Sequence, residues 1–310
     1  MKTFGLAMLA LICLDAAAAP AASPVHPACT TAYEEARAGK LAEAAAGMAE
    51  CAAASKPSLA VTVMLYDRVR ILDRLGRSEE ALAQRMALTD KAHFETGLDD
   101  AFSGPGAWSR DPERVKARQA VGLSRFDLLL DIAWNHHRAR NYQAAVDWSE
   151  RAARHALTRY RPESEFLPMD RDAGCALGLR GLARFELDPQ SGKLSWPDIS
   201  RGYIRGCTKL PLAQDIATQP EAVRQRLDEL KARFEALQAE AQRVSAAIRK
   251  REAQPSAGNG SYGDLAFGLM GRLADRKKDL EPLFKQRADF LAAETATLGR
   301  EPLSEIEAKP

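Results

Sequence analysis

The chain has 310 residues, of which 46% are apolar and 28% are charged, and its formal net charge is +2. This apolar fraction is ample for a packed core, and the length suggests one or two domains. The near balance of charge provides no strong basic field over the whole chain, so nucleic acid is excluded as an expected partner.

Residues 1–21 have the pattern of a secretory signal peptide. Lys2 precedes a short apolar run from Phe4 to Leu14, and an alanine-rich stretch with several possible cleavage points follows. The apolar run is shorter than the roughly 20 residues that cross a bilayer. We therefore expect a periplasmic or secreted protein after removal of the signal peptide, with no stable membrane insertion.

The segment 22–210 is expected to form an all-α domain of antiparallel helical hairpins. Sustained period-two alternation is absent, and apolar residues recur at helical spacing on both sides of short breaks. The first three hairpins are expected to turn at Gly39, Gly76 and Arg140. A fourth, less regular hairpin is expected within residues 175–210.

Over residues 28–210 these hairpins resemble tetratricopeptide repeats, in which small residues at fixed positions let two helices approach closely. The third hairpin carries the resemblance best, through Leu129, Ile132, Ala133, Tyr142, Ala145 and Ala152. An irregular array of helical hairpins without true repeat geometry remains the alternative.

The resemblance implies a concave groove lined by the first helix of each hairpin. Such a surface, rich in arginine and aromatic residues, is suited to a protein or peptide partner with an acidic group or a free carboxylate. A solvated helix face without a partner remains the alternative. The groove positions correspond to Tyr66, Arg70, Asp73 and Arg74 in the second hairpin and to Asp127, Trp134, His137 and Arg138 in the third.

Four cysteines remain after the signal peptide, an even number that favours two disulfides in an oxidising compartment. Cys29 and Cys51 lie near the two ends of the first hairpin, and antiparallel packing brings such positions together. Cys175 and Cys207 have the same relation in the fourth hairpin. We therefore predict these two pairs.

Residues 211–310 are expected to form an antiparallel coiled-coil hairpin, because two apolar seams flank a glycine-rich connection. A homodimer through the first seam remains possible. The first seam comprises Val223, Leu227, Leu230, Phe234, Leu237, Ala241, Val244 and Ile248, and the second comprises Leu273, Leu280, Phe284, Leu291 and Leu298.

Residues 163–179 resemble the glutamate motif of lytic transglycosylases, through Glu163, Ser164, Phe166, Pro168, Ala176, Gly178 and Leu179. That resemblance implies that Glu163 cleaves cell-wall glycan as a general acid and base. However, Pro162 interrupts the helix that should lead into the glutamate, and a coiled coil follows where that family completes its cleft. We therefore expect a connector between helices, ending near Pro168 and followed by a helix that opens near Asp172, with Glu163 catalysis as the alternative.

Taken together, the sequence predicts an exported binding or scaffold module of the bacterial cell envelope rather than an enzyme. An inhibitor or immunity protein of the periplasm is an alternative within the same class. No cofactor is expected. No metal site is expected either, because His136 and His137 are adjacent on a helix and cannot hold one ion together.

Overall fold

The computed structural model describes residues 27–56, 59–89, 125–159, 166–252 and 262–299. Within these ranges the chain is helical and contains no strand, which confirms the predicted all-α class. None of the helices in these ranges is long and apolar enough to cross a bilayer. Residues 1–21, predicted as a signal peptide, and Glu163 both lie outside the described residues.

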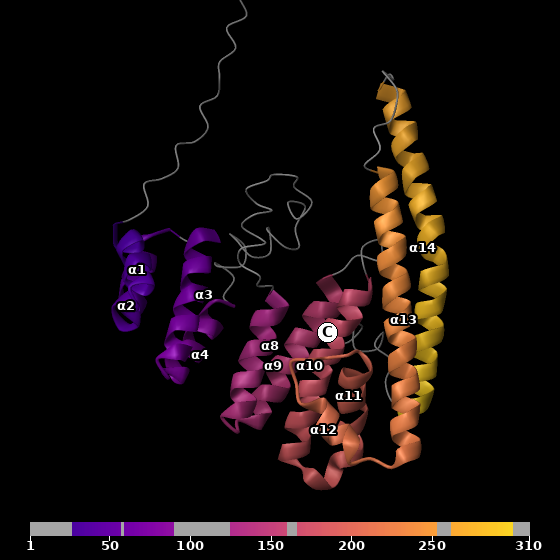
Figure 1. The fold of residues 1–310 in the computed structure, drawn as a ribbon, viewed down its shortest axis with the longest axis horizontal. Coiled ribbons are helices and arrows are strands. Elements are labelled where there is room, and N and C mark those ends of the chain that lie inside the picture. Colours follow the sequence, from indigo (N-terminus) through magenta and orange to yellow (C-terminus); the bar gives the residue numbers. More distant parts are fainter. Residues whose placement is uncertain (1–26, 57–58, 90–124, 160–165, 253–261, 300–310) are drawn as a thin grey trace, which may run out of the picture.

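Among the described residues, eight helices form an array of four hairpins, each packed against the next one described (Figure 1). In all four, consecutive helices pack against each other, as predicted. The helices are α1 (Pro27–Arg37), α2 (Leu41–Ala54), α3 (Leu59–Arg74), α4 (Ser78–Ala87), α8 (Arg125–Arg138), α9 (Tyr142–Arg159), α10 (Phe166–Leu187) and α11 (Gly192–Ile204).

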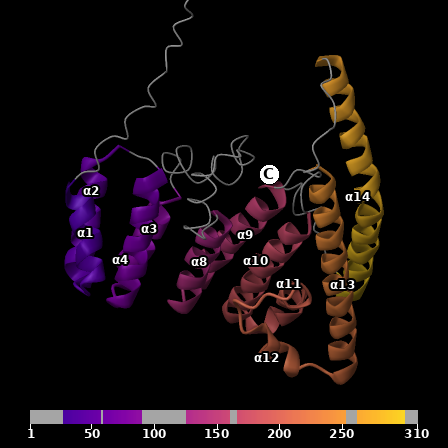
Figure 2. The same ribbon diagram turned by 45° about the horizontal axis from the view of Figure 1, so that its top comes forward.

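The remaining elements lead from the array into a long helical hairpin at one side of the molecule (Figures 1 and 2). A short 3₁₀ turn, η3 (Pro189–Ser191), connects α10 to α11, and α12 (Leu212–Ala217) follows α11. The hairpin consists of α13 (Glu221–Glu252) and α14 (Tyr262–Leu298).

Three hairpin turns in the array are built in the same way. Gly39, Gly76 and Arg140 follow the first helix with φ of 80°, 72° and 59°. In each turn, the amide of the residue that follows the positive-φ residue donates a 2.9 Å hydrogen bond to the carbonyl five positions earlier, as in a Schellman motif. The carbonyl of the same residue accepts the first hydrogen bond of the second helix, at 3.0 Å. The donors are the amides of the buried alanines Ala44, Ala81 and Ala145.

Glycine permits a close approach between α10 and α11. A Cβ atom added to Gly181 would lie 2.8 Å from the carbonyl oxygen of Ser195 and 2.9 Å from the amide nitrogen of Ile199. One added to Gly178 would lie 3.3 Å from the Cα of Gly202. The two helices therefore pack backbone against backbone, a distance that no larger residue allows.

Both predicted disulfides are present in the structure. Cys29 and Cys51 join the start of α1 to α2, with their Cα atoms 5.1 Å apart. Cys175 in α10 is joined to Cys207, just after α11, across 5.2 Å. The first and fourth hairpins are thus closed covalently.

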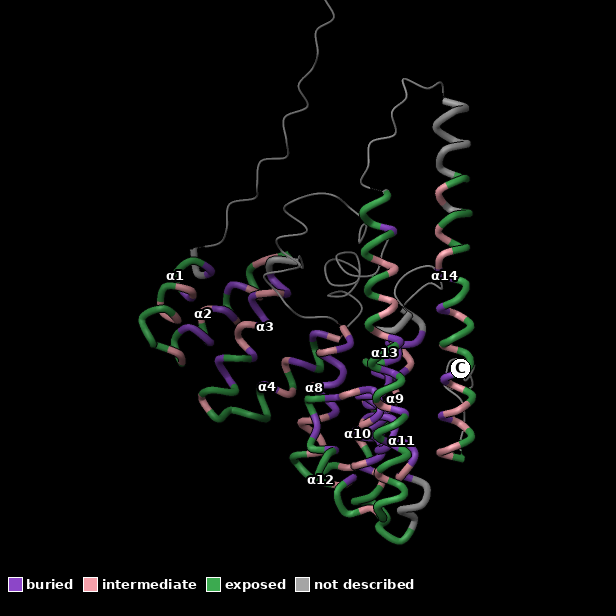
Figure 3. The backbone as a smooth tube through the Cα atoms, turned by 45° about the vertical axis from the view of Figure 1, so that its right-hand side comes forward, coloured by how far each residue is buried: buried purple, intermediate pink, exposed green. Residues whose placement is uncertain are grey.

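In the C-terminal hairpin the buried residues of α13 belong to the predicted first seam. Figure 3 shows that α13 and α14 also carry many exposed residues along their length. Leu227, Leu230 and Phe234 of α13 are almost fully buried, whereas Val223 at its start is exposed. The second seam differs from the prediction: Leu283, Phe290 and Glu294 are buried, while Phe284, Leu291 and Leu298 are only partly buried. The reason is that α14 contacts both α13 and the array, so its buried face is wider than one heptad seam.

Buried ion pairs fix the base of this hairpin to the array. Arg205 from the end of α11 and Glu294 of α14 form a bidentate pair, and both side chains are buried. The guanidinium also lies 5.5 Å and 5.6 Å from the ring centroids of Phe234 and Phe290. Arg287 makes two 2.8 Å bonds to the buried Asp170 of α10.

The expected connector before the fourth hairpin is partly corrected by the structure. Helix α10 begins at Phe166, so Pro168 lies in the first turn of a helix and Asp172 lies well inside it. Proline is tolerated there because the first amides of a helix have no intrahelical acceptor.

Candidate binding face on α3 and α8

The residues predicted to line a groove lie on α3 and α8, the first helices of the second and third hairpins. These helices share one apolar core, in which Leu72 of α3 and Ile132 of α8 are fully buried. They are also linked by a hydrogen bond from the Tyr66 hydroxyl to Asp131 Oδ2 at 3.5 Å. The structure therefore brings both halves of the predicted set onto adjacent helices.

Tyr66 differs from the prediction, because it is only 8% exposed. Burial raises its pKa to about 12, and the negative charge of Asp131 adds to the effect against the opposing charges of Arg70 and Arg85. Burial also raises the pKa of Asp131, which Arg85 and Lys209 oppose. Tyr66 thus joins the two helices and offers a partner little contact area.

The aromatic part of the face is an ordered stack on the third hairpin. The rings of Trp134 and His137 lie 5.3 Å apart and are nearly parallel, at 9°. Tyr142 meets His137 edge to face at 5.4 Å. Trp134 is partly buried against the core formed by α8, α9 and α10. Burial lowers the pKa of His137, so the neutral ring is favoured within the stack.

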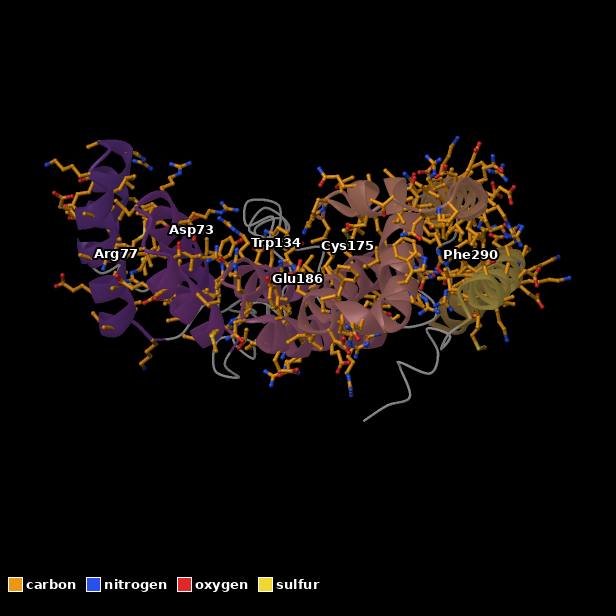
Figure 4. All side chains as sticks on the ribbon, turned by 90° about the horizontal axis from the view of Figure 1, so that it is seen from below. Asp73, Arg77, Trp134, Cys175, Glu186 and Phe290 are labelled. Carbon is orange, nitrogen blue, oxygen red and sulfur yellow. A yellow bond between two sulfur atoms is a disulfide. The ribbon has the colours of Figure 1, made fainter. Side chains whose placement is uncertain are left out.

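Both aspartates of the predicted set are neutralised by cations outside it. Asp73 accepts two bonds, of 3.2 Å and 2.5 Å, from Arg85 of α4. Asp127 pairs with Lys209, which follows α11. Figure 4 shows Asp73 and Trp134 in succession along the array, with Phe290 on the C-terminal hairpin beyond them.

The three arginines keep most of their charge available. Arg70 is exposed, lies 4.9 Å above the Tyr66 ring, and forms a long 3.8 Å ion pair with Asp67. Arg74 and Arg138 are exposed, and no described residue forms an ion pair with either. On this face the aspartates are paired with cations, whereas the guanidinium groups are largely without ionic partners. Such guanidinium groups attract carboxylates.

The sequence reasoning missed a repeated link between first helices. Tyr33 of α1 donates to Asp67 Oδ2 of α3 at 3.0 Å, just as Tyr66 of α3 donates to Asp131 of α8. Asp67 and Asp131 each lie nine residues before the positive-φ residue of their hairpin. That common spacing is the signal from which the two acceptors could have been found.

The remaining expectations concern Glu163 and the histidines. The catalytic alternative, Glu163, lies outside them. Within the described ranges no group of three or more histidine, cysteine, aspartate or glutamate side chains could hold a metal ion. His136 is half-buried, and burial lowers its pKa, as for a ring packed toward the interior.

Comparison of the chain with protein-family models, with curated proteins and with solved structures finds no match to any of them.

Proposed function

We propose that the protein is an exported protein-binding or scaffold module of the bacterial cell envelope. In this proposal the array binds a partner through the face formed by α3 and α8, and the partner presents an acidic side chain or a free C-terminal carboxylate. The observation that carries the proposal is the charge of that face: Arg74 and Arg138 have no ionic partner among the described residues, whereas Asp73 and Asp127 are paired.

The tetratricopeptide-like geometry is part of the same proposal. Three successive hairpins share the turn in which a positive-φ residue precedes the helix start and a buried alanine supplies the first helical bond. Repetition of one turn supports an array that grows by equivalent hairpins, and such arrays use the surface lined by their first helices for recognition.

Export is supported by the two disulfides, since paired cysteines persist in oxidising compartments and are rare in the cytosol. The leader-like residues 1–21 support the same compartment.

The test is a pull-down from envelope extract with the wild-type chain and with the triple variant Arg70→Glu, Arg74→Glu and Arg138→Glu. The matched control reverses three exposed cations elsewhere: Arg37→Glu, Lys40→Glu and Arg233→Glu. We expect the triple variant alone to lose the partner while its circular dichroism stays unchanged. Retention of the partner by the triple variant would show that this face is the wrong surface.

A second measurement separates a free carboxylate from a side-chain carboxylate. The C-terminal peptide of the captured protein is synthesised as the acid and as the amide. Binding of the acid alone indicates recognition of the terminus, whereas equal binding of both indicates an acidic side chain.

Enzymatic activity is tested directly by incubating the protein with peptidoglycan. We expect no release of anhydro-sugar product. Release that disappears in Glu163→Gln would replace the binding proposal with a transglycosylase.

A further inference from the structure

The C-terminal hairpin consists of two halves with opposite formal charge. The distal half, residues 241–252 of α13 and 262–285 of α14, contains nine basic and five acidic residues, a formal charge of +4. The proximal half, residues 221–240 and 286–298, contains five basic and seven acidic residues, a formal charge of −2. The overall charge of +2 therefore conceals a basic region at one end of the molecule.

Much of the distal positive charge is unpaired. Lys250 of α13 and Lys277 and Lys278 of α14 are exposed, and no described residue forms an ion pair with any of them. Two distal arginines form ion pairs of 2.6 Å, Arg243 with Glu240 and Arg251 with Asp279.

The start of α14 projects beyond the end of α13 (Figures 1 and 2). The antiparallel register brings Phe234 to Phe290 and Arg251 to Asp279, so Glu252 at the end of α13 lies opposite residues 272–278. Residues 262–271 of α14 consequently have no α13 residue opposite them.

This projecting end is rich in large apolar residue types. Met270 is 59% exposed, the largest exposure among the large apolar residues described. The sequence of the 253–261 connection contains no large apolar residue. The basic residues Arg272, Lys277 and Lys278 follow immediately along α14. The apolar residues of the projecting end are Tyr262, Leu265, Phe267, Leu269 and Met270.

We propose that the distal end of the hairpin binds the surface of a bilayer that contains anionic phospholipid. Apolar residues at the end of the hairpin enter the interfacial layer, and the cations behind them meet the lipid phosphates, as in interfacial helices. Each lysine or arginine near such a surface strengthens binding about five-fold. A segment of ten residues is too short to cross the bilayer, so the contact is peripheral.

A lipid surface fits these observations better than a polyanionic glycan does. A glycan would be bound by the cations alone and would leave the exposed Met270 in water. The proposal concerns a surface at the opposite side of the molecule from the α3 and α8 face, and it does not depend on the partner bound there.

Sedimentation with vesicles tests the proposal, using the chain freed of residues 1–21 because their apolar run would itself bind lipid. Vesicles of phosphatidylcholine alone are compared with vesicles containing phosphatidylglycerol at about a third of the lipid. We expect binding to the anionic vesicles and little to the neutral ones. Absence of binding to both, or equal binding to both, would overturn the proposal.

Charge variants locate the surface. The distal reversal Lys250→Glu with Lys278→Glu should weaken binding at least about 25-fold, since two attractive charges become repulsive. The proximal control, Arg226→Glu with Arg233→Glu, changes the net charge equally and should have a much smaller effect. An equal loss in the two variants would show that net charge, and not the distal end, governs binding.

A fluorescent probe separates lipid contact from simple charge attraction. Met270→Cys introduces a single free thiol beside the two disulfides, and a polarity-sensitive dye placed there should shift to shorter wavelength on anionic vesicles. The same dye at Ala232→Cys, on an exposed proximal position, should not shift. An unshifted dye at position 270, or binding to dextran sulfate without binding to vesicles, would favour a glycan partner and refute the lipid proposal.

Discussion

The helical array and the distal half of the C-terminal hairpin place basic residues and glycines in opposite environments. In and beside the array, Arg205 is buried with Glu294 and Gly181 lies against the backbone of α11. In the distal hairpin, Lys250 is exposed without an ion pair, and a Cβ atom on Gly271 would meet nothing within 4 Å. Basic side chains and glycines therefore take part in the interior in one region and lie on an exposed surface in the other, a difference that the overall composition does not reveal.

The largest expected effect on stability comes from removing one carboxylate from each region. Glu294→Ala should destabilise the protein by about 3–5 kcal/mol, because it leaves the guanidinium of Arg205 buried without its counter-ion. Asp279→Ala breaks the exposed pair with Arg251 and should cost less than about 1 kcal/mol. Urea unfolding followed by circular dichroism measures both. Similar losses of unfolding free energy in the two variants would contradict the difference between the buried and the exposed ion pair.

The second test removes a covalent link from the array. Cys175→Ser with Cys207→Ser opens a loop with a sequence separation of 32 residues, for which chain entropy predicts a loss of about 3–4 kcal/mol. All four tryptophans precede residue 211, so their fluorescence monitors the array and not the C-terminal hairpin. We expect the fluorescence transition to move to lower urea.

Peptide mapping without reductant provides the matching control for the cysteines. It should recover Cys29 with Cys51 and Cys175 with Cys207, with no free thiol in the chain freed of residues 1–21. A link between Cys51 and Cys175 would contradict the hairpin packing described above.

The third test places the same substitution at a crowded and at an open glycine. Gly181→Ala should cost about 1–3 kcal/mol, because the new methyl group would meet backbone atoms of α11 at 2.8–2.9 Å. Gly271→Ala should stabilise the protein by about 0.5–1 kcal/mol, because alanine favours the helix and the space around it is open. Thermal unfolding of the two variants should therefore shift in opposite directions.

The smallest effect is expected at the third turn of the array. Arg140 has a φ of 59°, where Gly39 and Gly76 serve in the equivalent turns. Arg140→Gly should stabilise the protein by about 0.5–1 kcal/mol, since glycine adopts this conformation without a steric penalty. Gly76→Arg should lower stability by a similar amount. A loss of stability in Arg140→Gly would mean that contacts of the arginine side chain outweigh the backbone strain.

The sequence predicted local features of the fold well and long-range polar contacts poorly. Leu227, Leu230 and Phe234 were found because a heptad pattern depends only on neighbouring turns of one helix. The buried Glu294 could not be found in this way, because its partner Arg205 lies 89 residues away and neither residue type is expected in a core.

The candidate face was predicted only in part for the same reason. Position within a repeat placed Arg74 and Arg138 on adjacent helices, and both are exposed there. It also placed Tyr66 in the groove. However, the burial of Tyr66 depends on how closely the next hairpin packs against it, and the sequence of its own hairpin does not specify that distance. The link from Tyr66 to Asp131 spans 65 residues.

The length of α14 has a consequence for how far the molecule can reach. Met270 and Glu294 belong to one helix and are 24 residues apart, which corresponds to about 36 Å along the helix axis at ~1.5 Å per residue. One end is anchored to the array by the ion pair with Arg205, and Met270 near the other end is exposed. An object that touches Met270 therefore lies several nanometres from the helices that the anchored end contacts.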